Sequence, residues 1–340
     1  MPPHQPRAPS ASLHPARSGV SGTSVGMFAI VVLIWLLSLV VVALPAYGAA
    51  VLAGWEPVTT VVVAGAAWTA SAALVLARPV EAGLAWLLYR SLRRPRPAEL
   101  ARITPALSRV CRRAGTDPGR YLLRVEEKRQ VNAFALGGHV LAVTRMALEL
   151  PDDMLEAVLA HEVGHHRHLH PLAIILGWWY LLPFEAGDRL LRAIRRVTRW
   201  LARSFGRLSD RTGGVAGGRQ PDGALGMLVL LAVLGVLVVA GTVLVVGLGL
   251  LWLPLALLVR LAKVLAAALS RAGEHAADRH AAELGYGPGL VQVLALFLRA
   301  EQSASRPRGM AALLRSHPSS QSRIDSINQT LHLRASTIYR

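Results

Sequence analysis

The residues with the clearest chemical potential form one short segment, HEVGHHRHLH, which runs from His161 to His170. In a helix, residues four apart lie on the same face, so His161 and His165 can direct two imidazoles at one metal ion. Glu162 lies between them, where it can act as general base toward water at that metal. The spacing therefore predicts a hydrolytic zinc site on a helix.

A chance match is the competing interpretation, since the chain holds 12 histidines and five of them fall in this segment. His166 and His170 are also four apart, but Arg167 stands where the glutamate would have to be. Only the first pair has the chemistry of a hydrolytic site.

The residues around the motif predict the helix that carries it. Pro151 precedes Asp152 and Asp153, which can cap the helix start, and Glu156 follows Asp153 by three residues. Gly164 leaves room for close packing behind the site. Three apolar side chains are expected to face the core: Leu155, Val158 and Leu159.

Two histidines leave a catalytic zinc one protein ligand short of the usual three. The segment Ser270–Gly285 has helical spacing and places Glu274 and Asp278 one turn apart. Glu274 can ligate the metal while Asp278 accepts a proton from a ligand imidazole and fixes its orientation. His275 and His280 are rival ligands, and a solvated helix face is the alternative for the acidic pair alone.

Composition indicates a membrane protein. Of 340 residues, 53% are hydrophobic and 17% charged, against about 25% charged in soluble domains. The net charge is +17, and the arginines flank apolar runs without a base-stacking module. We therefore expect lipid headgroups as counter-charge and no nucleic acid partner. Cys111 is the single cysteine, so an intramolecular disulfide is excluded.

Two charge-free runs near the N-terminus, Met27–Tyr47 and Val58–Ala77, each reach the ~20 residues that span a bilayer. Residues 1–26 are predicted to be a disordered tail, with a signal peptide as the competing interpretation. The linker Gly48–Pro57 has no Lys or Arg, so both ends of this hairpin are expected in the cytoplasm. Five arginines follow the second run: Arg78, Arg90, Arg93, Arg94 and Arg96.

A small sheet is predicted before the metal motif. A helix over Ala98–Ala114, ended by Gly115, precedes three predicted strands. These are Tyr121–Val125, Val131–Leu136 and Val140–Thr144. A strand edge beside zinc can hold substrate by backbone pairing. The pattern is equally compatible with strands that only cover the helix.

Beyond the motif, a short apolar run covers Leu172–Phe184, and a basic segment follows from Glu185 to Arg207. Its arginines recur at steps of three and four opposite an apolar stripe, which predicts an amphipathic helix at a membrane surface, with a solvated face as the alternative. Thr212–Gly223 is glycine-rich. A charge-free run from Gly223 to Val259 then exceeds the length of one span.

A shared zinc requires an even number of crossings between His165 and Glu274. Either Leu172–Phe184 crosses outward and Gly223–Val259 returns, or Gly223–Val259 crosses twice as a hairpin near Gly241. The first is favoured, although it puts the basic helix outside, against the positive-inside tendency. Both arrangements give four spans and a cytoplasmic zinc.

Four segments in order resemble the HtpX-type membrane zinc metallopeptidases, relatives of the CAAX-prenyl endopeptidases. They are VNAFALGGHVLAVT, HEVGHHRH, SRAGEHAADRHAAELG and SHPSSQSRI, which run from Val131 to Ile324, and the resemblance around them covers Arg102 to about Ile327. The last segment departs from the pattern, because Pro-Ser-Ser stands where many relatives have Pro-Pro and an acidic residue.

The resemblance implies roles for individual residues. It implies a zinc site of His161, His165 and Glu274, with Glu162 as base. It also implies Asn132 and Ala133 at the substrate cleft, and His317 and Arg323 near the transition-state oxyanion.

We thus expect a mainly α membrane protein with a gluzincin-like zinc peptidase domain, a small β-sheet and about four transmembrane helices. The expected activity is zinc-dependent endopeptidase hydrolysis, with one zinc per subunit, in quality control of membrane proteins at the cell membrane. A regulated signalling peptidase and a catalytically silent scaffold are the alternatives. The expected organisation is a tail (1–26), a transmembrane hairpin (27–90), two catalytic segments (98–170 and 261–340) and membrane helices with a basic linker (171–260).

Overall fold

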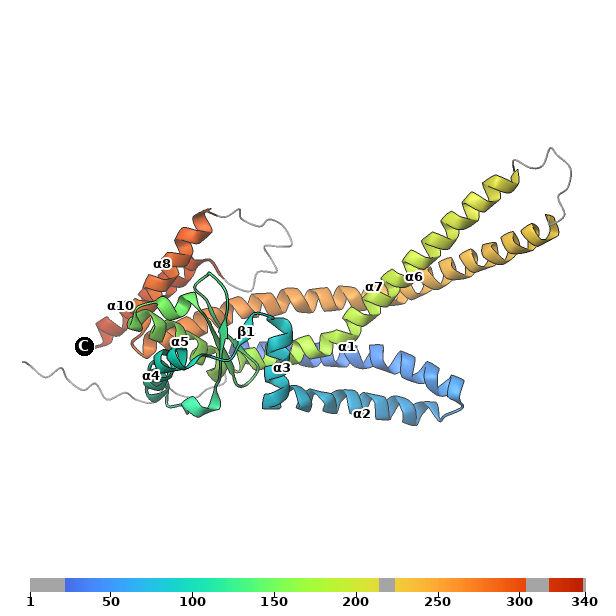
Figure 1. The fold of residues 1–340 in the computed structure, drawn as a ribbon. Coiled ribbons are helices and arrows are strands. Elements are labelled where there is room, and N and C mark those ends of the chain that lie inside the picture. Colours follow the sequence, from blue (N-terminus) through green and yellow to red (C-terminus); the bar gives the residue numbers. More distant parts are fainter. Residues whose placement is uncertain (1–21, 214–223, 304–317, 339–340) are drawn as a thin grey trace, which may run out of the picture. The chain divides into compact units, whose positions relative to one another are not determined.

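The computed structural model describes residues 22–213, 224–303 and 318–338 (Figure 1). Contacts divide the chain into two compact units. The sheet unit holds the described residues of Met1–Phe28, Leu76–Ile175 and Ala267–Arg340, and the helical unit holds those of Ala29–Val75 and Leu176–Ala266. Both units combine segments that lie far apart in the sequence.

The sheet unit is built on four short strands: β1 (Leu92–Arg93), β2 (Leu122–Glu126), β3 (Ala133–Leu136) and β4 (Val140–Thr144). Their order is β1-β2-β4-β3, with β2 and β4 parallel and the other two pairs antiparallel. Strand β3 therefore lies at one edge, with a single strand neighbour among the described residues.

Helices complete the sheet unit: α3 (Arg78–Leu88), α4 (Pro97–Ala114), α5 (Asp152–Arg167), α8 (Gly287–Ser303) and α10 (Ser320–Ile338). The apolar faces of α4, α5, α8 and α10 share one core with β2 and β4, because an isolated helix or small sheet cannot bury its apolar side alone. Fully buried members include Ile103, Leu107, Val110, Leu141, Leu155, Leu159, Leu294 and Ile327.

Most elements predicted in this unit are present. Helix α4 ends at Gly115, which has a positive φ of 65°. Strand β4 has the predicted bounds, and β2 is shifted by one residue. Strand β3 begins two residues later than predicted, because the Asn132 N–H is bound to Thr144 Oγ1 at 3.0 Å. Strand β1 was not predicted, since two residues carry no periodicity.

The predicted cap of α5 is wrong. The residue before the helix is Pro151, and neither Asp152 nor Asp153 caps it from that position, because the helix already begins at Asp152. Asp152 instead pairs with Arg102 at 2.9 Å, and Glu156 pairs with Arg109 at 2.7 Å. Both carboxylates thus tie α5 to α4 rather than to its own N-terminus.

In the described residues, the helical unit contains most of α1 (Gly22–Ala53), all of α2 (Pro57–Val75), and those parts of α6 (His170–Gly213) and α7 (Ala224–Glu283) that lie between Leu176 and Ala266. Among the described residues, α1, α2 and α7 are long and apolar enough to cross a membrane. Helices α1 and α2 run antiparallel and are joined by a short turn (Figure 1). The outer parts of α6 and α7 also run antiparallel to each other.

Polar contacts fix three of these helices against one another. Each of three indole N–H groups donates to a hydroxyl on a neighbouring helix: Trp35 to Thr69 (3.0 Å), Trp68 to Ser38 (2.8 Å) and Trp179 to Ser71 (2.9 Å). In lipid, such bonds replace contacts that water cannot supply. They set the register of α1, α2 and the first half of α6.

Several expectations for the membrane segments are corrected. Residues 22–26 are helical rather than part of a tail, because the Ser24 hydroxyl donates to the carbonyl of His168 at 2.8 Å. Residues 1–21 lie outside the described residues. The linker after α1 shrinks to residues 54–56, since α1 continues through Ala53.

The hairpin arrangement near Gly241 is wrong, because α7 is one continuous helix of 60 residues. The apolar run and the basic segment that precede it also form one helix, α6, of 44 residues. An unbroken ladder of backbone hydrogen bonds satisfies every N–H and C=O through Gly241 without a turn. Most of the glycine-rich segment, residues 214–223, lies outside the described residues.

Candidate metal centre

The site lies where α5 meets the last turns of α7. Gly164 makes this approach possible: a Cβ there would lie 3.1 Å from Ala277 Cα and 3.2 Å from its carbonyl oxygen. Backbone atoms cannot move aside as a flexible side chain can. The room expected behind the motif is thus filled by α7, which brings its carboxylates to the histidines.

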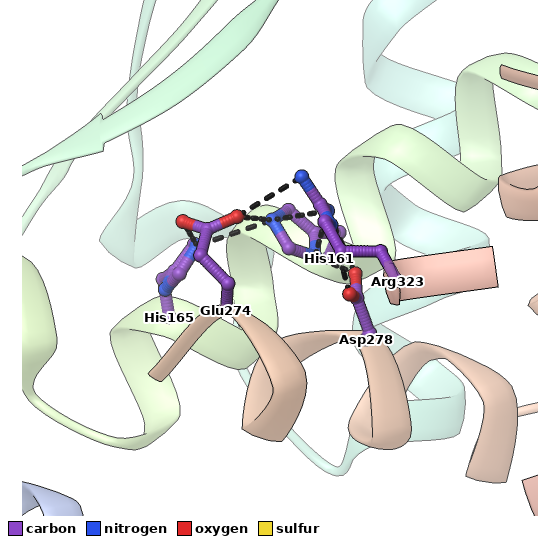
Figure 2. A network of polar contacts seen from close by, with 5 residues as sticks. All are labelled: His161, His165, Glu274, Asp278 and Arg323. Carbon is purple, nitrogen blue, oxygen red and sulfur yellow. Dashed lines mark hydrogen bonds and ion pairs between the residues drawn. The ribbon is translucent and has the colours of Figure 1, made fainter. Parts of the chain in front are cut away.

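Three side chains converge at the crossing of these helices (Figure 2). The Nε2 atoms of His161 and His165 are 3.1 Å apart. Glu274 places one carboxylate oxygen 3.2 Å from His165 Nε2 and the other 3.6 Å from His161 Nε2. All three residues are buried or nearly so.

This donor set fits a tetrahedral zinc ion. Ligand atoms bound at about 2.0–2.1 Å around such an ion lie about 3.3 Å from one another, which is the spacing found here. Two imidazoles and one carboxylate also leave a fourth position open, as catalytic zinc sites do. Among the described residues, this is the one group of three side chains arranged to hold a metal.

Asp278 lies one turn beyond Glu274 and orients His161 from the opposite side of its ring. Its Oδ1 accepts from His161 Nδ1 at 2.9 Å, which leaves Nε2 to face the metal position. Asp278 is fully buried and is held in turn by Arg323, whose Nε and Nη2 donate to its two oxygens at 2.8 and 2.7 Å. A carboxylate fixed in this way sets both the tautomer and the ring orientation of a ligand histidine.

Arg323, on α10, also contacts the third ligand, because its Nη1 lies 3.0 Å from Glu274 Oε2 (Figure 2). The guanidinium thus touches both Glu274 and Asp278 of α7. The carboxylates in turn raise the pKa of Arg323, against the effect of its burial. His317, expected near the same position, lies outside the described residues.

The electrostatics of this site favour a cation. Burial and the charge of Arg323 act against the imidazolium of His161, yet its bonds to Asp278 and Glu274 raise its pKa to about 10. Two carboxylates beside a buried imidazole therefore outweigh desolvation. The same excess of negative charge suits a divalent metal.

Among the described residues, no other histidine belongs to this group of three side chains, although the ring centre of His170 lies 5.5 Å from that of His165. His166 is buried, and burial lowers its pKa to about 4, while its Nε2 lies 3.2 Å from the carbonyl oxygen of Val140. His280 packs against Gly164, and its ring centre lies 6.4 Å from that of His168. Neither His280 nor His275, the rival ligands, belongs to the group that could hold a metal.

A cleft of about 740 Å³ opens onto the three ligands. Glu162 lines it and is buried, so a carboxylate faces the same space as the metal position. Asn132 and Ala133, expected at the substrate side, line it as well, together with the rest of β3. The structure thus brings Glu162, Asn132, Ala133 and Arg323 to one cleft.

The free edge of β3 offers backbone groups to this cleft. Thr144 N–H donates to the Asn132 carbonyl at 2.9 Å and Asn132 N–H donates to Thr144 Oγ1 at 3.0 Å, so the backbone groups of Asn132 face β4. Bonded and non-bonded pairs alternate in an antiparallel ladder, and Ala133 and Ala135 occupy the non-bonded positions opposite Val143 and Leu141. Their N–H and C=O groups therefore point outward, whereas those of Asn132 are used within the sheet.

The sequence interpretation missed one wall of the cleft and one residue that supports the sheet beside it. The wall is an apolar stripe on α8, formed by Leu290, Val293, Leu294 and Phe297, whose spacing of three and four was a readable helix signal. The supporting residue is Glu81 of α3, which is fully buried and accepts from the N–H groups of His139 (2.8 Å) and Val140 (3.0 Å). Glu81 thereby fixes the turn between β3 and β4, and the signal for it in the sequence was a lone carboxylate in an apolar helix.

The fold and this site define a class of protein. The chain matches the family Peptidase family M48 over residues 97–201 and 221–331, which include all three candidate ligands, and it belongs to that family. It is similar to a curated relative from Aeropyrum pernix named Protease HtpX homolog, with 42% identity over 87 residues. This alignment covers 24% of the present chain and 26% of that relative. The resemblance to HtpX-type metallopeptidases is confirmed.

Proposed function

We propose that this protein is a membrane-embedded zinc endopeptidase that cleaves peptide bonds in protein substrates. The observation that carries the proposal is the convergence of His161, His165 and Glu274 within ligand distance of one another, at the floor of a cleft that also contains Glu162. Membership of a metallopeptidase family supports the same reading.

Each residue has a distinct part in the proposed reaction. His161, His165 and Glu274 hold zinc, which supplies Lewis acidity that polarises the scissile carbonyl and acidifies water. Glu162 takes a proton from the attacking water and passes it to the leaving amine. Asp278 keeps His161 in the tautomer that binds metal.

Substrate binding uses the edge of β3. The outward N–H and C=O groups of Ala133 and Ala135 can pair with an extended substrate backbone, which makes no demand on sequence. The apolar stripe of α8 faces the same cleft and favours apolar side chains next to the cleaved bond. A cleft that binds the substrate backbone and apolar side chains suits unfolded or damaged membrane proteins. The proposed role is therefore quality control of membrane proteins.

The proposed location is the cell membrane, with several spans and the cleft facing the cytoplasm. The arginines after α2 support this orientation, because positive residues remain on the cytoplasmic side. A regulated signalling peptidase would use the same site on dedicated substrates. A silent scaffold would keep the fold without turnover.

Metal analysis combined with a casein cleavage assay tests this proposal on the purified full-length protein. We expect one zinc per chain, and cleavage that a chelator abolishes and added zinc restores. Bound zinc without any cleavage would favour the scaffold, and cleavage that resists the chelator would exclude the proposed mechanism.

A further inference from the structure

The outer parts of α6 and α7, residues 185–213 and 224–252, form an antiparallel pair that we call the arm. Helix α7 has no charged residue from Ala224 to Val259. Its apolar side chains are exposed on several faces, for example Leu228 (63%), Val239 (64%) and Leu250 (68%). A helix of this composition requires a hydrocarbon environment rather than water.

Helix α6 of the arm is amphipathic in a different way. Seven exposed arginines recur at steps of three and four along one side: Arg189, Arg192, Arg195, Arg196, Arg199, Arg203 and Arg207. Leu190 and Val197, two turns apart, are exposed on another face. Exposed Trp200 lies between the two faces, a position that tryptophan favours at a membrane interface.

Close contacts hold the two helices of the arm together. Trp252 Nε1 donates to Asp188 Oδ1 at 2.6 Å. A Cβ on Gly241 would lie 2.9 Å from Thr198 Oγ1, so the absence of a side chain lets the helices meet there. The arginines therefore remain about one helix diameter from the apolar surface of α7, whatever the orientation of the arm.

The position of the metal ligands limits that orientation. His165 Nε2 and Glu274 Oε1 are 3.2 Å apart, so the chain between them crosses a bilayer an even number of times. If the arm part of α7 crossed the bilayer, the arm part of α6 would have to cross it as well. If both crossed, the seven arginines would enter hydrocarbon, among the most costly placements for any side chain.

We propose that the arm lies along the membrane surface, with α7 among the acyl chains and the arginine face of α6 bound to anionic phospholipid headgroups. This orientation keeps the charge-free helix in lipid and each guanidinium near a phosphate. It does not depend on the peptidase activity.

Probe depth along α7 tests the orientation. Leu228, Val239 and Leu250 are spaced by 11 residues, about 16 Å of helix, and share one face. Each is replaced by cysteine in a Cys111→Ser background and labelled with bimane. The full-length protein is then reconstituted into vesicles of phosphatidylcholine and phosphatidylglycerol that contain nitroxide lipids.

We expect equal bilayer depths for the three probes, measured by nitroxide quenching. Steps of roughly 16 Å between successive probes would establish a crossing arm, and no quenching at any probe would place the arm outside the bilayer; either result overturns the proposal.

Lipid charge is tested with two matched variants. One replaces Arg192, Arg196, Arg199 and Arg203 by Gln, and the other replaces the same four by Lys. From an equal mixture of phosphatidylcholine and phosphatidylglycerol, we expect the wild type to retain phosphatidylglycerol with about fivefold enrichment, measured by native mass spectrometry. The Lys variant should keep this enrichment and the Gln variant should lose it. Absence of enrichment in the wild type, or its persistence in the Gln variant, would refute the anionic partner.

Discussion

At the scale of single residues, two carboxylates of the same helix face opposite nitrogens of one imidazole. Glu274 lies near Nε2 of His161, and Asp278 accepts from Nδ1 at 2.9 Å. Both groups are carboxylates, so their chemical type does not distinguish their proposed roles. The role depends on which nitrogen of His161 each one faces: Nε2 for the proposed metal ligand and Nδ1 for the positioning group. Arg323 reinforces this difference, because it donates to both oxygens of Asp278 but lies near only one oxygen of Glu274.

Glu162→Gln tests the proposed general base. The three ligands are untouched, so we expect zinc content to remain at the wild-type level. Cleavage of casein should fall at least ~100-fold, because an amide cannot accept the proton. The exposed Glu149 of the same unit provides the control, and Glu149→Gln should cleave normally. Comparable turnover in Glu162→Gln and the wild type would rule out this mechanism.

Alanine at Glu274 and at Asp278 separates the roles of these two carboxylates. Glu274→Ala should lose zinc outright, because two imidazoles alone hold the ion poorly. Asp278→Ala should weaken zinc affinity by about 10–100-fold, because His161 loses its orienting partner. Competition with a metal-sensitive dye gives both affinities. If Asp278→Ala loses more affinity than Glu274→Ala, the two roles have been assigned the wrong way round.

The sequence was sufficient to predict which residues share a helix face. It was insufficient to predict which side chains from different elements meet after folding. His161 and His165 are one turn apart, as are Glu274 and Asp278, so period alone places each pair. The partnership of Asp278 with Arg323 spans 45 positions and depends on how α10 packs. The cap of α5 was mispredicted for a related reason. Asp152 forms an ion pair with Arg102 of α4 instead of a hydrogen bond with the backbone of its own helix.

At the scale of elements, the contact of α5 with α7 decides whether the ligands can meet. Gly164→Ala would place a Cβ against the backbone of Ala277, so we expect a loss of about 1–3 kcal/mol in stability and weaker zinc binding. Gly138→Ala is the matched control, because a Cβ there has no neighbour within 4 Å. Thermal unfolding in detergent measures both. A Gly164→Ala protein as stable as Gly138→Ala would show that the helices can shift freely.

The edge of β3 makes a separate prediction. Ala135→Pro removes an N–H that points away from β4, so the sheet should persist while substrate pairing weakens. We expect the KM for an extended peptide to rise about tenfold, the upper range for one lost hydrogen bond, with zinc content unchanged. Ala135→Ser keeps the N–H and should retain the wild-type KM. Equal KM values for the Pro and Ser variants would exclude backbone pairing at this position.

At the scale of the whole molecule, the candidate metal centre limits the number of membrane crossings together with hydropathy. Three helices are long and apolar enough to span among the described residues, but α7 cannot be the only one to cross between the ligands on α5 and α7. Hydropathy alone could not reveal the partner of α7, because α6 carries its apolar run and its arginines in one continuous helix. With the arm at the membrane surface, the four-span plan therefore requires residues 172–184 of α6 to cross outward and the part of α7 beyond residue 252 to return.

A cysteine at Ser209, near the outer end of α6, decides whether that crossing occurs. The variant is made in a Cys111→Ser background and exposed to an impermeant thiol reagent on intact cells. We expect labelling, because an outward α6 carries Ser209 to the external leaflet even when the arm lies along the surface. Trp55→Cys, in the turn between α1 and α2, should label in the same way, and Arg112→Cys, on α4, should label only after lysis. Ser209 protection until lysis, with both controls as expected, would leave two spans, α1 and α2, and place the arm on the cytoplasmic leaflet. That outcome would follow the positive-inside tendency, and it would contradict the four-span plan.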